Sequence, residues 1–190
     1  MKYHFEIHKE KKGYSARCVE LKGCRTEADS FDSLLENMRE ALDLFLDEPM
    51  ESDFEFPLPN PVLKGKGILE IPVSPNIALA LTLRNARKKH QMTQKETADA
   101  MGFKGLFSYQ HLESSKTANP ELATLDKIKS LFPEIEFDSI IHGMHRNNSF
   151  VMQIANEWGH VVEKNYKESG IYKTKSAAVK AAKIFSKKVP

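Results

Sequence analysis

Apolar side chains occupy every second position in the first stretches of the chain. The alternation runs over residues 2–8 and again over 14–18, and a period of two is typical of half-buried strands. A turn at 11–13 joins these strands into a predicted hairpin, and residues 24–28 can form a third strand after a second turn. The apolar positions of the first two strands are Tyr3, Phe5, Ile7, Tyr14, Ala16 and Cys18.

The spacing of apolar residues then changes to three and four, which is the stripe of an amphipathic helix. The stripe consists of Leu34, Leu35, Met38, Leu42 and Phe45. Ser30 is placed to cap this helix, which should end before Pro49. The proline-rich, acidic residues 49–61 predict a linker or an extended crossover, and residues 68–73 predict a short strand. The predicted order is therefore β-β-β-α-β.

The middle of the chain carries helical signals. Ser74-Pro75 sets a cap residue before a proline at the first helical position. Thr93 and Glu96 match a capping box, and Asn119-Pro120 is interpreted as the cap of a later helix. The expected helices cover residues 75–89, 94–102, 105–112, 120–131 and 138–144.

The last part of the chain predicts a second small sheet and a helix. Residues 150–156 and 159–165 indicate a hairpin with Trp158 at its tip, and residues 174–188 have an alanine-rich helical face capped by Thr174. This stretch faintly resembles a small domain family of unknown function. Because so short a unit is hard to stabilise alone, we expect it to pack on the rest of the chain or on a second copy.

The fold class predicted from these patterns is α+β, in three segments. They are residues 1–75 (sheet and helix), 76–145 (all-α) and 146–190 (hairpin plus helix). The formal net charge of +2 conceals a gradient along them. The first segment holds 10 Lys/Arg and 15 Asp/Glu, the second 9 and 8, and the third 9 and 3, giving −5, +1 and +6. An acidic end suits a basic partner, and a basic end suits a polyanion such as nucleic acid, although scattered solvated charge would give the same counts.

Composition excludes several classes of protein. No apolar run approaches the roughly 18 residues of a spanning helix, and the charged, alternating N-terminus does not match a signal peptide. Cys18 and Cys24 are expected to be reduced thiols in a cytoplasmic protein. No carboxylate, histidine or cysteine pattern indicates a metal site or a catalytic centre, so neither an enzymatic activity nor a cofactor is expected.

The central helices carry the signals of a DNA-binding module. Two helices joined by a short turn containing glycine can place the second helix in the major groove of DNA. Residues 76–132 resemble the Cro/repressor (Xre-type) helix-turn-helix, with a turn slightly longer than that family has. The motifs that carry the resemblance are Thr93-Gln94, Ala98, Gly102, Ser108–Glu113 and Asn119–Leu125.

The DNA contacts predicted from this resemblance and from side-chain chemistry lie in two groups. Candidates on and around the second and third helices are Gln94, Lys104, Ser108, Tyr109 and His111. Candidates for phosphate contacts at the end of the first helix are Arg84, Lys88 and Lys89, with Arg87 in the same basic cluster. Gln110 and Glu113 are interpreted as internal caps rather than base readers, and Tyr109 could equally belong to the core.

Residues 1–48 resemble the HicB antitoxin domain. The matching stretches are Gly13-Tyr14, Gly23–Ser30, Glu36-Asn37 and Glu40–Leu42, whereas Lys22 stands where the family often has proline. The resemblance implies a partial RNase H-like βββαβ fold that covers the active site of a HicA-type toxin, a small basic ribonuclease that cleaves mRNA. The acidic charge of this segment suits such a partner.

The two resemblances together predict an antitoxin that neutralises a HicA-type toxin and binds operator DNA to regulate its own transcription. A homodimer or a larger even oligomer is expected, because two half-sites on double-stranded DNA supply the affinity that one small module lacks. Two alternatives stay open. One is a stand-alone transcriptional regulator whose N-terminal domain senses a ligand or oligomerises, and the other is a nuclease with an RNase H-like site.

Overall fold

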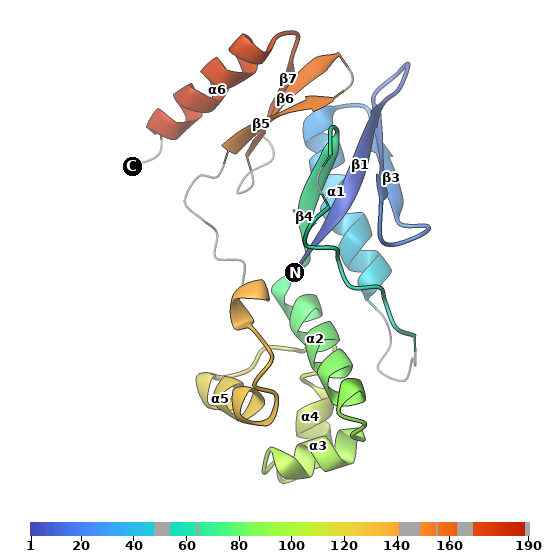
Figure 1. Ribbon diagram of the computed structural model, residues 1–190, viewed down its shortest axis with the longest axis vertical. Coiled ribbons are helices and arrows are strands. Elements are labelled where there is room, and N and C mark those ends of the chain that lie inside the picture. The colour runs from blue at the N-terminus through green and yellow to red at the C-terminus, as the bar shows by residue number, and fades with distance from the viewer. Residues whose placement is uncertain (48–53, 64, 141–148, 155, 163–168, 189–190) are drawn as a thin grey trace. The chain divides into compact units, whose positions relative to one another are not determined.

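The computed structural model describes residues 1–47, 54–63, 65–140, 149–154, 156–162 and 169–188 (Figure 1). The chain divides into two compact units. The first, here the helical unit, comprises Met1, residues 43–56 and residues 73–142. The second, here the sheet unit, comprises residues 2–42, 57–72 and 143–190. The chain therefore passes from one unit to the other several times.

The sheet unit contains a four-stranded antiparallel sheet with strand order β3-β2-β1-β4. Its strands are β1 (Lys2–Lys9), β2 (Tyr14–Cys18), β3 (Arg25–Ala28) and β4 (Ile68–Pro72), and the helix α1 (Phe31–Leu46) lies between β3 and β4 in the chain. The order β-β-β-α-β predicted from the sequence is confirmed, and so is the α+β fold class.

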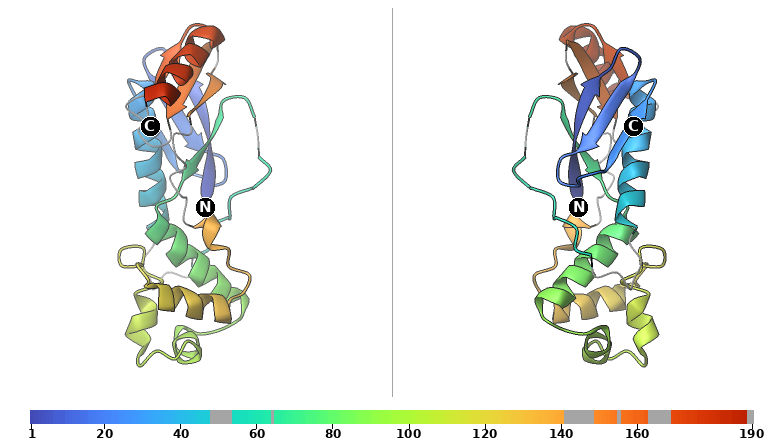
Figure 2. Two further views of the ribbon diagram at one scale, coloured as in Figure 1. Left: turned by 90° about the vertical axis from the view of Figure 1, so that its left-hand side faces the viewer. Right: turned by 90° about the vertical axis from the view of Figure 1, so that its right-hand side faces the viewer.

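One face of this sheet and one stripe of α1 form the core of the sheet unit. The alternating residues Tyr3, Phe5 and Ile7 are at most 5% exposed. Figures 1 and 2 show α1 along one face of the sheet. Its side chains Leu34 and Leu35 are fully buried. Ser30 caps the helix as predicted, because its Oγ accepts a hydrogen bond from the amide of Ser33.

A second sheet in the same unit has the order β5-β6-β7 and is followed by α6. Its elements are β5 (Ser149–Ile154), β6 (Glu157–Val162), β7 (Gly170–Tyr172) and α6 (Lys175–Lys188). Thr174 Oγ1 accepts a hydrogen bond from the Ala177 amide, which confirms the predicted cap. In the sheet unit Tyr14 donates a hydrogen bond to Glu157 at 3.0 Å, so this C-terminal part packs on the N-terminal sheet.

The hairpin of the second sheet turns earlier than predicted. Ile154 pairs with Glu157 and Gln153 pairs with Trp158, so Trp158 lies within β6 rather than at the tip. Asparagine at 156 favours a turn and tryptophan favours a strand, which accounts for the shift.

The helical unit contains four helices and one short 3₁₀ turn among its described residues. They are α2 (Pro75–Lys89), α3 (Gln94–Ala100), α4 (Leu106–Gln110), α5 (Leu122–Leu131) and η1 (Phe137–Ser139). The helix α5 begins after Glu121 rather than directly after the predicted cap Asn119-Pro120, because Glu121 is still extended at ψ 161°. Of the helix predicted over 138–144, the structure forms only η1, and residues 141–144 lie outside the described residues.

Candidate nucleic-acid interface

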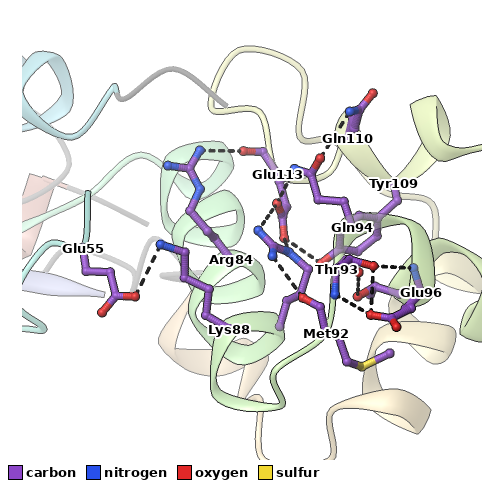
Figure 3. Close-up of polar contacts among 12 residues, drawn as sticks. Glu55, Arg84, Lys88, Met92, Thr93, Gln94, Glu96, Tyr109, Gln110 and Glu113 are labelled. Atoms are coloured by element: carbon purple, nitrogen blue, oxygen red, sulfur yellow. Dashed lines mark hydrogen bonds and ion pairs between the residues drawn. The ribbon is translucent and has the colours of Figure 1, made fainter. Parts of the chain in front are cut away.

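The helix α3 begins at a capping box. Thr93 Oγ1 accepts a hydrogen bond from the Glu96 amide at 3.1 Å, and Glu96 Oε2 accepts one from the Thr93 amide at 2.8 Å (Figure 3). The exchange satisfies two amides that the start of a helix otherwise leaves without intrahelical partners. The capping box predicted from the sequence is confirmed, and it fixes where α3 begins.

Residues 101–105 lead from α3 to α4. Gly102 has a φ of +67°, a left-handed conformation that favours glycine, and the amide of Phe103 donates to the Ala98 carbonyl at 2.9 Å. Ala98 is 1% exposed, and α3 and α4 pack against each other. The turn glycine and the small buried residue predicted for a helix-turn-helix are therefore both present.

The carboxylate of Glu113 is the centre of a buried polar network (Figure 3). Arg87 on α2 donates from Nε to Oε1 at 2.6 Å and from Nη2 to Oε2 at 3.0 Å. Tyr109 on α4 donates its hydroxyl to Oε1 at 2.7 Å, and Gln94 on α3 donates its amide to Oε2 at 2.8 Å. Because donors from three helices satisfy one wholly buried carboxylate, the network holds these helices in one relative orientation.

Burial and charge in this network determine the protonation states of Arg87 and Tyr109. Burial by itself lowers the pKa of Arg87, but the hydrogen bonds and charge of Glu113 outweigh burial and raise that pKa. Burial, followed by the charge of Glu113, raises the pKa of Tyr109 well above its ordinary value. Arg87 therefore stays cationic and Tyr109 stays a hydroxyl donor across the physiological pH range.

The outer face of α4 consists of exposed side chains. Lys104 precedes the helix and Ser108 lies on it, and both are exposed. His111, at the end of α4, is half-buried. These three of the predicted DNA-binding residues occupy one short stretch of surface, which can present donors and acceptors to base edges or phosphates.

The remaining predicted DNA-binding residues have other surroundings. Tyr109 is fully buried. Of the two interpretations of this residue, DNA contact or core position, the core position is therefore the correct one. Gln94 is half-buried, and besides its bond to Glu113 its carbonyl accepts from Gln110 Nε2 at 3.2 Å. We therefore interpret both Tyr109 and Gln94 as residues that position α4.

The basic end of α2 is only partly at the surface. Arg84 is 4% exposed and its Nη2 lies 3.5 Å from the carbonyl oxygen of Glu113, so its guanidinium is turned inward. Lys88 forms an ion pair with Glu55 at 3.3 Å, and Lys89 is exposed. Of these three predicted phosphate contacts, Lys89 is the one whose described surroundings leave it at the surface.

Sequence reasoning missed two exposed apolar residues at the start of α4. Leu106 is 39% exposed and Phe107 is 70% exposed. The sequence analysis assigned neither residue a role. Helical spacing places Phe107 on the opposite side of α4 from Tyr109, but the sequence left open whether Tyr109 is buried, so the spacing alone did not predict the exposure of Phe107.

Comparison with known proteins identifies the family of the chain. No family model matches it. The chain is 30% identical over 70 residues to UPF0150 protein ssr1765 of Synechocystis sp., and the match covers 35% of this chain and 89% of that protein. The chain belongs to the UPF0150 family, a HicB-like family. The match accounts for about a third of the chain, so the interpretation of α2–α4 in this HicB-like protein depends on their geometry.

The sheet unit of the HicB-like chain carries an acidic surface next to its N-terminal sheet. Asp32, Glu36 and Glu40 follow one another at intervals of four along α1, which places them on one side of the helix. Glu36 and Glu40 are exposed. Asn37 donates from Nδ2 to the Glu27 carbonyl at 3.1 Å, which links this part of α1 to β3.

A buried His-Glu pair lies at the other end of β1 from the hairpin turn. His4 Nδ1 is 2.5 Å from Glu20 Oε1, and the His4 amide donates to Glu20 Oε2 at 3.1 Å. Cys18 and Cys24, which flank Glu20 in the sequence, are both buried and form no disulfide. Among the described residues no group of three or more His, Cys, Asp and Glu side chains is arranged to hold a metal ion, and no helix could cross a membrane.

Proposed function

We propose that this HicB-like chain is an antitoxin that binds and neutralises a HicA-type, mRNA-cleaving toxin and represses transcription by binding operator DNA. The family relationship supports the first activity, because it identifies a HicB-like protein at about 30% identity. The arrangement of α2–α4 around Glu113 supports the second, and it is the observation on which the DNA-binding part depends.

In the DNA-binding part, α4 enters the major groove of double-stranded operator DNA. The capping box and the Glu113 network hold α3 and α4 rigidly, so that the outer face of α4 can contact base edges without reorganisation. Lys104 and Ser108 on that face supply contacts to phosphates and bases, and Lys89 adds charge at the end of α2. Two copies of the chain, in a homodimer or a higher even oligomer, contact the two half-sites.

In the toxin-binding part, the acidic surface of the sheet unit contacts a basic ribonuclease. Glu36 and Glu40 face solvent on α1, where they can pair with basic side chains of the toxin. Complementary charge accelerates encounter and orients the two proteins. The chain acts by covering the toxin and has no catalytic activity of its own in this proposal.

Binding of DNA is tested with the full chain and a random duplex pool, from which bound sequences are selected and their affinities measured at several salt concentrations. Lys104→Ala should weaken binding and reduce the slope of log affinity against log salt by about one unit. Lys180→Ala, an exposed lysine of α6, is the matched control and should leave the slope unchanged. Failure to enrich any sequence would contradict the proposed DNA binding.

Binding of toxin is tested by mixing the full chain with a HicA-type ribonuclease and measuring RNA cleavage. The wild-type chain should inhibit cleavage, and Glu36→Lys with Glu40→Lys should weaken inhibition at least tenfold through like-charge repulsion. The matched control makes the same change of charge in the helical unit, at the exposed Glu121 and Asp126. RNA cleavage by the chain alone, with Mg²⁺ or Mn²⁺ added, would instead indicate a nuclease.

A further inference from the structure

The most exposed apolar side chain of α4 is aromatic. Phe107 is 70% exposed, and its neighbour Leu106 is 39% exposed. A phenylalanine at the surface of a monomer needs no explanation by itself, but this one lies on the helix that we propose to enter a DNA groove. The question is therefore which chemical group of the DNA Phe107 contacts.

The orientation of Phe107 is fixed from two sides. The ring packs edge-on against His111, with centroids 4.3 Å apart and an interplanar angle of 80°. Tyr109, about 200° around the helix from Phe107, is buried and donates its hydroxyl to Glu113. Because Tyr109 prevents α4 from rotating and His111 supports the ring, Phe107 faces solvent in a defined position.

A hydrocarbon side chain in the major groove can recognise one feature of a base pair. The C5-methyl group of thymine is the only apolar group there, and phenylalanine is among the side chains that contact it. We propose that Phe107, supported by His111, recognises the 5-methyl group of a thymine in the operator. This inference rests on the DNA binding proposed above and names a determinant of its sequence specificity.

The charges around Phe107 suit a polyanion such as DNA. The helix α4 contains no acidic residue, and exposed Lys104 and Ser108 flank the aromatic side chain. The one carboxylate that follows α4, Glu113, is wholly buried and paired with Arg87. An apolar group set between a cation and a hydroxyl complements a methyl group next to phosphates.

The test uses the full chain and the duplex selected from the random pool. Each thymine is replaced in turn by deoxyuridine, which lacks only the methyl group. At one thymine in each half-site the affinity should fall about fourfold, the factor expected for burying one methyl group. With Phe107→Ala the thymine and deoxyuridine duplexes should bind equally, because the contact is already lost.

Leu122→Ala is the matched control, since Leu122 is 84% exposed at the start of α5 and its truncation removes apolar surface elsewhere in the same unit. This variant should retain the fourfold preference. Equal binding of wild-type protein to all deoxyuridine duplexes, or a preference that survives in Phe107→Ala, would overturn the inference while leaving the proposed DNA binding intact. Absence of any selected duplex would instead count against the proposed function itself.

Discussion

Arg87 and Glu113 form a two-point ion pair inside the helical unit, with Nε to Oε1 at 2.6 Å and Nη2 to Oε2 at 3.0 Å. The Glu113 side chain is 0% exposed and that of Arg87 is 13% exposed. The two residues come from different parts of the chain, so the pair ties the end of α2 to the segment that follows α4. Its contribution can be measured.

Replacing Glu113 by alanine should lower the free energy of unfolding of the helical unit by about 3 kcal/mol, because Arg87 would remain buried without its counter-charge. Urea unfolding followed by circular dichroism measures the change. The double variant Arg87→Met, Glu113→Leu should recover part of the loss, since it leaves no charge uncompensated. A loss below about 1 kcal/mol in Glu113→Ala would show that the pair is not the main tie between these segments.

Removing the capping hydroxyl of α3 should have a smaller effect. Thr93→Ala should cost about 1 kcal/mol of stability, the usual value for losing an N-cap side chain. Thr93→Ser retains the oxygen that accepts from Glu96 and should stay close to wild type. If serine and alanine at this position prove equally destabilising, the lost methyl group rather than the cap would be responsible.

Two glycines with positive φ should respond differently to alanine. Gly13, at φ +75°, would place a Cβ 2.2 Å from the backbone oxygen of Ala28, so Gly13→Ala should cost about 3 kcal/mol or more. Gly102, at φ +67°, has nothing within 4 Å of that position, so Gly102→Ala should cost only the backbone strain, about 1 kcal/mol. Similar losses at the two positions, measured by thermal unfolding, would contradict this assignment.

Glu20 should make the sheet unit sensitive to acid. Burial by itself raises the pKa of Glu20, but hydrogen bonds from His4 and from the amide of Asn60 outweigh burial and hold that pKa below its ordinary value of 4.5. A carboxyl group whose folded-state pKa is lowered stabilises the fold above its ordinary pKa. This stability is lost as the pH falls from about 4.5 through the folded-state pKa.

Glu20→Gln should therefore flatten the dependence of the unfolding free energy on pH below about 4.5, by at most about 1.4 kcal/mol per pH unit. Glu10→Gln, at an exposed carboxylate of the hairpin turn, is the control. An identical pH profile for wild type and Glu20→Gln would show that the hydrogen bonds to Glu20 do not stabilise its charged form.

Features that depend on neighbours in the chain were predictable from the sequence. The alternation in β1 and β2 placed Tyr3 and Phe5 in the core, and the spacing of Thr93 and Glu96 gave the start of α3. In each case the deciding contacts lie within a few residues, where periodicity and capping rules apply.

Features that depend on distant partners were not predictable. The rotation of the short helix α4 is set by the bond from Tyr109 to Glu113, which no pattern within α4 indicates. Lys88 seemed free for phosphate, but its partner Glu55 lies in a proline-rich segment far from it in the sequence. Exposure of Phe107 follows from the same rotation of α4, so it became visible only with the three-dimensional arrangement.

The way the two units share the chain has a consequence for biosynthesis. A ribosome adds roughly 5–20 residues per second and releases the N-terminal part first. The helical unit can close once residues 73–142 have emerged, whereas the sheet unit, although it contains the earliest strands, also needs the late residues 143–190. The N-terminal sheet has all four of its strands once β4 has emerged, but it waits for β5–β7 to pack on it. During that delay of seconds the nascent polypeptide exposes the surface that these late strands cover to chaperones and to any partner already present.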